Sequence, residues 1–361
     1  MKDPFIYFFR DNFTPPYKQK NVALAAQKPR IEFIDLAKGV CILLVVMMHS
    51  GVGCEIPALP ALRMPLYFML SGLFFKDYGS FLNFTEKKIN KILVPFIFFF
   101  FLGFVFHQLF APLLGRELSF YAFREPFLRS DMNASNASIW FLICLFWVNL
   151  LYCIISISVR YLWLRALIVF LLGGTGYFLH LHQVYLPLFF ASSLTALPFF
   201  FAGLLLRKFP LLYAGQYDRL GPLLGGLIII LIVCCCICCG TPWIDFRANF
   251  YHGNPLIIFP LSVSFVVGLL LVCKGIGWLP IVSYMGRYSI MVLGLHLFFL
   301  WFGYLTYVSP FVIFLLSSFF SWLLIPVCRA YLPHVTAQAD WVRLPRRRKA
   351  GGGADGKQTV S

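Results

Sequence analysis

Residues 30–50 read RIEFIDLAKGVCILLVVMMHS, and this stretch decides how the rest of the chain is interpreted. It is apolar and long enough for a membrane helix, yet it contains Asp35, Lys38 and His49. Ionisable side chains in an apolar span are costly, so they usually face a protein-lined or wet cavity and mark a functional path. Lys38 and His49 are eleven residues apart, which places them on one side of a helix, about 16 Å apart. Asp35 shares that face and can pair with Lys38.

The composition is that of a polytopic membrane protein. Of the 361 residues, 60% are hydrophobic and 12% are charged. A soluble core cannot absorb so much apolar surface, so apolar runs separated by short basic loops predict an all-α bundle of membrane helices. No secretory signal with a cleavage site is evident near the start. The 11 cysteines, five of them within residues 234–239, suit helix packing better than a metal site or a disulfide framework.

The apolar runs predict a membrane domain of about ten helices at residues 30–329. The expected spans are about 31–51, 60–76, 92–114, 138–158, 161–181, 186–206, 221–239, 255–273, 281–302 and 308–328. Residues 1–29 are expected to form a cytoplasmic or interfacial segment, and residues 330–361 a basic, disordered tail. The termini and the loops on their side hold 24 of the 30 Lys and Arg residues. Both termini are therefore expected to be cytoplasmic, with loops 115–137 and 240–254 outside.

The polar residues of the first span and of the basic loop after the second span are the candidates for chemistry. Neutral His49 can accept a proton from a hydroxyl near neutral pH, or it can act as a nucleophile. A buried ion pair and a hydrogen-bonded histidine that only fix helix packing would explain the same pattern. Lys88 and Lys91 share a face of a regular helix and, with Lys87, can bind a phosphate-rich ligand. Topology and contacts with lipid headgroups are the simpler explanation of these lysines.

Six motifs occur in an informative order along the chain. They are Asp35-Lys38-Gly39-His49, MPLYFMLSGLFF (64–75), KKINKILVPF (87–96), IWFLICLF (139–146), LPFFFAGLLL (197–206) and MGRYSIMVLGLHLF (285–298). Over residues 30–328 the chain thereby resembles the membrane-bound acyltransferase-3 family, and it is most similar to the stand-alone fucose 4-O-acetyltransferase-like branch. The resemblance implies a ten-helix enzyme of the bacterial inner membrane. Such an enzyme moves an acyl group, usually acetyl, from cytoplasmic acyl-coenzyme A to a sugar hydroxyl of a cell-surface or lipid-linked glycan.

The resemblance also implies roles for individual residues. It places His49, Lys38 and Asp35 at the catalytic position, and Lys88, Lys91 and Lys87 at the donor. Lys38, Lys88 and Lys91 stand where arginine is the familiar residue of the family, so the charge is kept and planar bidentate recognition is lost. Many relatives carry a secreted esterase-like domain, which this chain is expected to lack.

Ser71, Trp140 and His296 are further candidates for lining a pocket. Trp140 is equally typical of an anchor at the membrane interface, and His296 of a packing residue hydrogen-bonded to a carbonyl or hydroxyl. The expected partners are acyl-coenzyme A as a substrate, the glycan acceptor and the bilayer, with no bound cofactor, metal or nucleic acid. A transporter or flippase of a polar or glycan-related substrate is the competing function, and an accessory membrane protein is a third. Dependence on coenzyme A separates the enzyme from both.

Overall fold

The computed structural model describes residues 31–54, 56, 58–110, 112, 124, 128, 130, 136–209, 219–240, 243–305 and 308–344. The predicted segment 1–29, most of loop 115–137 and residues 345–361 lie outside this part of the chain. In chain order, the principal elements are α2 (Glu32–His49), α3 (Pro60–Leu73), α4 (Phe81–Lys88), η2 (Ile89–Leu93), α5 (Val94–Phe110), η4 (Ala137–Ile139), α7 (Trp140–Ser158), α8 (Leu162–Leu181), η5 (Pro187–Phe189), α9 (Phe190–Leu206), α10 (Leu220–Gly240), β1 (Trp243–Asp245), β2 (Phe250–His252), α11 (Pro255–Ile276), α12 (Val282–Arg287), α13 (Ser289–Leu305) and α14 (Pro310–Tyr331).

Among the described residues, seven helices are long and apolar enough to cross a membrane. They are Phe81–Phe110, Ala137–Ser158, Leu162–Leu181, Pro187–Leu206, Leu220–Gly240, Pro255–Ile276 and Pro310–Tyr331. The prediction of a helical membrane protein is confirmed, whereas the count of ten and the side of the termini stay predictions. The three other predicted spans differ from these seven for physical reasons. α2 carries three charged residues, and α3 and α13 are only 14 and 17 residues long.

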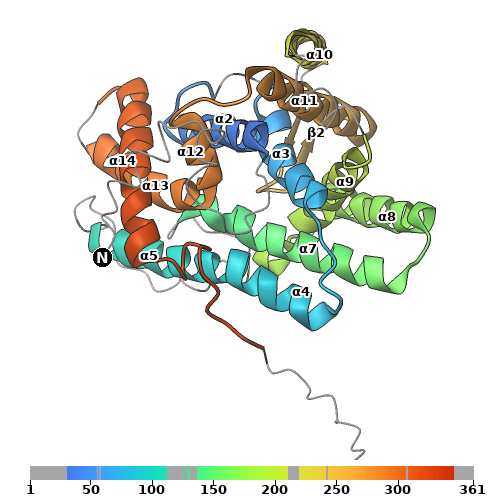
Figure 1. Cartoon of the computed structure of the whole chain (residues 1–361), viewed down its shortest axis with the longest axis horizontal. Helices are drawn as coiled ribbons and strands as arrows, with labels where there is room; N and C mark the ends of the chain where they lie inside the picture. The colour runs from blue at the N-terminus through green and yellow to red at the C-terminus, as the bar shows by residue number, and fades with distance from the viewer. Residues whose placement is uncertain are drawn as a thin grey trace, which may run out of the picture.

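The polar helix α2 lies inside the bundle, in contact with α3, α11, α12, α13 and α14 (Figure 1). Its packing against α12 is unusually close, because glycine stands on both helices at the contact. A Cβ atom on Gly39 would lie 1.9 Å from the carbonyl oxygen of Val282, and one on Gly286 would lie 1.9 Å from that of Asp35. Glycine is therefore required at both positions, and the two backbones touch.

The helix from α4 to α5 is interrupted by η2, a single π-helical turn. The side-chain amide of Asn90 donates a hydrogen bond of 2.9 Å to the carbonyl oxygen of Glu86, which the backbone N–H of Asn90 would use in a regular α-helix. Such π-turns are rare and occur frequently at functional sites. The widened turn changes the directions in which the lysines on either side of it project.

A two-stranded antiparallel hairpin, β1 and β2, lies between α10 and α11 in the sequence, with Ile244 opposite Tyr251. It contacts α3 through β1 and α8 through β2. Phe246, in the turn of the hairpin, is buried, and its ring lies 5.5 Å from that of Phe68 on α3. The hairpin is thereby held against the same helix that forms one wall of the site described below.

Candidate active site

A cavity of about 260 Å³ lies between α2, α3, η2, α7 and α13. It is lined by Lys38, Ile42, Met64, Tyr67, Leu70, Ser71, Phe74, Lys88, Ile92, Phe141, Leu142, Leu145, Ser289, Ile290 and Leu293. Most of these side chains are apolar, and the two ammonium groups are the only charged groups among them. The cavity therefore suits a ligand that joins an anionic group to a slender, largely apolar arm.

Lys38 and Lys88 come to this cavity from elements far apart in the sequence. The ammonium group of Lys38 lies 5.7 Å from the ring centroid of Phe74, and that of Lys88 lies 5.2 Å from the ring centroid of Phe84. Aromatic faces at this distance attract a cation and hold it in place. The structure thus brings together two of the lysines that the sequence singled out, although 50 positions separate them.

Lys88 and Lys91 project into different surroundings, unlike the common face expected from a regular helix. Lys88 lines the cavity, whereas Lys91 donates a hydrogen bond of 2.8 Å to the carbonyl oxygen of Ala337. The π-turn between them is the reason, because a wider turn rotates the second residue away from the first. The spacing alone could not reveal this.

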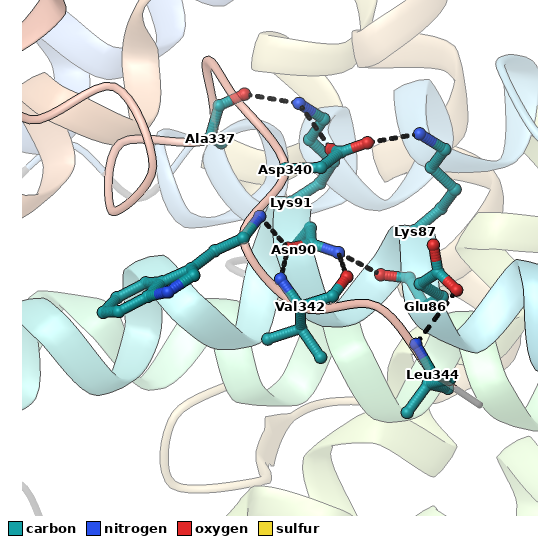
Figure 2. Close-up of polar contacts among 9 residues, drawn as sticks. Glu86, Lys87, Asn90, Lys91, Ala337, Asp340, Val342 and Leu344 are labelled. Atoms are coloured by element: carbon teal, nitrogen blue, oxygen red, sulfur yellow. Dashed lines mark hydrogen bonds and ion pairs between the residues drawn. The ribbon is translucent and has the colours of Figure 1, made fainter.

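Residues 337–344, which follow α14, lie across α4 and η2, as Figure 2 shows. The carboxylate of Asp340 binds Lys87 at 2.5 Å and Lys91 at 3.3 Å. The hydrogen bond from Lys87 and the charge of Lys91 hold the pKa of the Asp340 carboxyl group below its usual value, although its partial burial acts in the opposite direction. The part of the predicted disordered tail that the structure describes is therefore bound, with its own carboxylate on two of the predicted donor lysines.

Asn90 provides the main attachment of this segment. It is 1% exposed. Its amide group donates to the carbonyl oxygens of Glu86 and Val342, at 2.9 and 2.7 Å, and its oxygen accepts the backbone N–H groups of Trp341 and Val342, at 2.6 and 2.7 Å (Figure 2). All four hydrogen-bonding positions of the amide are used. One side chain thus fixes both the π-turn and the position of the C-terminal segment.

Asp35 is paired with Arg287 of α12, with 3.4 Å between Nε and the carboxylate oxygen. The sequence suggested Lys38, three residues away on the same helix. The close packing of α2 on α12 explains the different partner, because Gly39 and Gly286 let the end of α12, which carries Arg287, approach α2 at the level of Asp35. Asp35 therefore ties two helices together beside the cavity, and it is not among the residues that line the cavity.

His49 at the end of α2 lies beside His296 of α13, with their ring centroids 5.2 Å apart. His296 is fully buried, and its Nδ1 lies 3.0 Å from the carbonyl oxygen of Val292. A carbonyl only accepts hydrogen bonds, so Nδ1 carries the proton and Nε2 of the neutral ring has a lone pair. Within the described residues, Nε2 has no hydrogen-bond partner. His296 has the hydrogen bond expected of a packing residue, and it also contacts the leading catalytic candidate.

The cavity approaches this histidine pair but does not include it. Its lining ends on α2 at Ile42, seven residues before His49, and on α13 at Leu293, three residues before His296. Seven helical residues correspond to about 10 Å. The lysines and the histidines therefore lie toward opposite ends of α2.

The two other pocket candidates have different positions. Ser71 lines the cavity and accepts a hydrogen bond of 3.1 Å from Asn149 of α7, a residue that the motifs did not single out. Trp140 is 6% exposed and packs against Phe189, with 5.6 Å between the ring centroids. It is absent from the lining of the cavity. Its burial also differs from that of an interfacial anchor, whose ring meets water or lipid headgroups.

Arg63 on α3 is the main residue of this region that sequence reasoning missed. It is 8% exposed, and its Nη1 has no hydrogen-bond partner within the described part of the chain. His49 interacts electrostatically with Arg63 and with Arg247 of the β-hairpin. An arginine at the start of an apolar span, directly before the motif MPLYF, was the available signal. The sequence alone gives Arg63 no role, because a sequence does not show burial.

Comparison with known families adds an independent finding. A family model described as an acyltransferase domain, of the acyltransferase-3 type, matches residues 31–329. This range starts at the beginning of α2 and ends within α14, so it includes both the cavity and the histidine pair. No curated protein and no solved structure matches the chain significantly.

Proposed function

Since this chain belongs to the acyltransferase-3 family, we propose that it is a membrane O-acyltransferase that moves an acetyl group from acetyl-coenzyme A to a sugar hydroxyl of a cell-surface or lipid-linked glycan. The observation that supports the proposal is the arrangement of polar groups along α2. A mostly apolar cavity with two lysines lies beside the first part of this helix, and a pair of histidines lies at its other end. The cavity and its lysines suit a thioester donor, and the histidines suit the removal of a proton from a hydroxyl acceptor.

The cavity would hold the acylated arm of coenzyme A. The arm is a narrow chain with few charges, which suits walls formed by residues such as Ile42, Leu145 and Leu293. Lys88 and Lys38 would contact the phosphates at the start of the arm, because ammonium groups form strong charge-assisted hydrogen bonds with phosphate. Lys87 and Lys91 would contact the outer phosphates after exchanging the carboxylate of Asp340 for them. Phosphate and carboxylate compete for the same ammonium groups.

His49 would act as the general base of the transfer. Its neutral ring accepts the proton of the acceptor hydroxyl as that oxygen attacks the thioester carbonyl carbon. The C–S bond then breaks, the acyl group stays on the sugar oxygen, and the thiolate of coenzyme A takes up the proton from the imidazolium. His296 would orient His49 through the ring contact. An acyl group carried transiently by His49 would give the same products in two steps.

Mass spectrometry of surface glycan from cells with and without this protein tests the proposal. We expect a glycan that loses an acetyl mass when the protein is absent and regains it when the protein is restored. Isotopically labelled acetyl-coenzyme A, added to membrane vesicles that contain the purified protein and the same glycan, should transfer its label. An unchanged glycan together with no release of coenzyme A would exclude this function and favour a transporter.

A further inference from the structure

Arg63 is a buried cation for which the described part of the chain supplies no direct anionic partner. Its side chain is 8% exposed, and Nη1 makes no hydrogen bond there. A buried charge is expensive unless it is paired and hydrogen-bonded. A bound anion would offset this cost, so a buried arginine of this kind is a candidate for ligand binding.

The geometry of α2 and α3 directs Arg63 toward His49. The hydroxyl of Tyr67 donates to the carbonyl oxygen of Lys38 at 3.1 Å, and the thiol of Cys41 donates to that of Arg63 at 3.1 Å. The sequence number rises on α2 while it falls on α3, so the helices are antiparallel. Helical side chains lean toward the N-terminus of their own helix. Arg63 and His49 therefore lean toward each other, in agreement with their electrostatic interaction.

Arg247 and Asp245 of the β-hairpin are the other charged groups that interact with His49 or Arg63. Arg247 of the β-hairpin also interacts with His49. Asp245 interacts electrostatically with Arg63, but its Oδ1 accepts the backbone N–H groups of Arg247 and Ala248, at 2.9 and 3.3 Å. Asp245 thus shapes the turn of the hairpin and forms no ion pair with Arg63. Because Arg63 forms no ion pair with this carboxylate within the described part of the chain, its Nη1 can donate to an added anion.

We propose that Arg63 binds an anionic group of the acceptor, a carboxylate or a phosphate, and thereby holds the acceptor hydroxyl at His49. This inference rests on the proposed function and names the class of acceptor. The phosphates of the donor are assigned to the lysines at the other end of α2, so they do not compete for Arg63. A guanidinium group offers several donors in a fixed plane, which matches carboxylate and phosphate oxygens. The acceptor is therefore an acidic sugar or a sugar attached to a phosphate.

Binding measurements on the full-length protein in lipid nanodiscs, without donor, test this inference directly. The probes are methyl glucuronide, glucose 1-phosphate and uncharged methyl glucoside. At least one of the two anions should bind about tenfold more tightly than methyl glucoside, as expected for one charged hydrogen bond. The anion that binds tightly identifies carboxylate or phosphate as the group. Equal binding of all three probes would overturn the inference.

Three variants test whether Arg63 causes the preference for an anionic probe. Arg63→Gln should bind the three probes alike, Arg63→Lys should keep part of the preference, and Arg160→Gln, at an exposed arginine between α7 and α8, should behave as the parent does. Unchanged binding of acetyl-coenzyme A and an unchanged melting temperature show that Arg63→Gln is folded. If this folded variant keeps the full preference for the anion, the inference is wrong.

Acetyl transfer to the same probes is measured separately. Loss of the anion preference in Arg63→Gln, with transfer to methyl glucoside preserved, supports acceptor binding. An equal loss of transfer to charged and uncharged acceptors, with binding unchanged, overturns it and assigns Arg63 to the thioester carbonyl. If no probe is acetylated but the anion binds through Arg63, the proposed function fails and the binding site stands.

Discussion

The cationic groups at the two ends of α2 differ in how they are neutralised. At the α4–η2 end, Lys87 and Lys91 meet the carboxylate of Asp340, and all three side chains are between 34% and 42% exposed. Beside His49, Arg63 is buried and its Nη1 has no hydrogen bond within the described residues. Exposed ion pairs contribute little to stability, so a ligand can replace Asp340 at low cost. A buried guanidinium without an ion pair is costly, so an anionic ligand that pairs with Arg63 offsets this cost and binds more tightly.

The largest effect should come from removing His49. His49→Ala should insert and bind acetyl-coenzyme A normally but lose acetyl transfer by at least about a hundredfold, the low end for loss of a general base. The measurement is the rate of label transfer from acetyl-coenzyme A to glycan. His182→Ala, at an exposed histidine after α8, is the matched control. Transfer at a near-normal rate by His49→Ala would move the catalytic assignment to His296 or elsewhere.

His296→Ala should have an effect between those of His49→Ala and the control. Loss of the ring contact leaves His49 in place but less well oriented, so transfer should fall by about tenfold. The rate should fall without a change in the apparent affinity for the donor, because His296 is not among the residues that line the cavity. A loss as large as that of His49→Ala would instead make His296 a second catalytic group.

Lys88→Gln and Lys91→Gln test the separation that the π-turn creates. Lys88 lines the cavity, so its loss should weaken binding of acetyl-coenzyme A by about tenfold, as for one charged hydrogen bond. Lys91 is already engaged by Ala337 and Asp340, so its loss should weaken binding by less than about threefold. Isothermal titration with the purified variants measures both values. Equal losses would support the shared helical face that the spacing suggests.

The smallest effect concerns Asp340. Asp340→Asn should improve binding of acetyl-coenzyme A by about two- to threefold, because the competing carboxylate is removed from an exposed site. The Asp340 pKa is lower in the folded protein than in the unfolded chain. The contribution of its ion pairs is therefore complete above the unfolded pKa and lost as the pH falls through the lowered folded pKa.

Cysteine labelling can follow this pH dependence. A single cysteine placed at position 338, in a background without other reactive cysteines, is labelled in the parent protein and in Asp340→Asn at the same pH, so that the fall in thiolate at low pH cancels. Labelling of the parent should be slower than that of Asp340→Asn at neutral pH and should approach it as the pH falls below about 4, near the pKa of a free aspartate. Equal labelling of the two proteins at neutral pH would mean that Asn90, rather than Asp340, controls the segment.

Much of the general architecture could be predicted from the sequence, because it depends on hydrophobic composition and on the spacing of residues along a helix. Runs of apolar residues must become helices in a bilayer, where every backbone polar group needs an internal partner. The polar residues within one such run, Asp35, Lys38 and His49, already pointed to α2 as the centre of the molecule. The family also followed from the order of short motifs, and the match over residues 31–329 confirms it.

Only the tertiary structure decided which polar groups meet. Asp35 pairs with Arg287, Lys88 and Lys91 separate at a π-turn, and His296 lies beside His49. Each of these contacts joins helices distant in the sequence or departs from regular helical geometry. The burial of Arg63 is of the same kind, because an arginine at the end of a span looks identical in sequence whether water or protein surrounds it. Periodicity describes one helix at a time, whereas pairing and burial depend on how neighbouring helices pack.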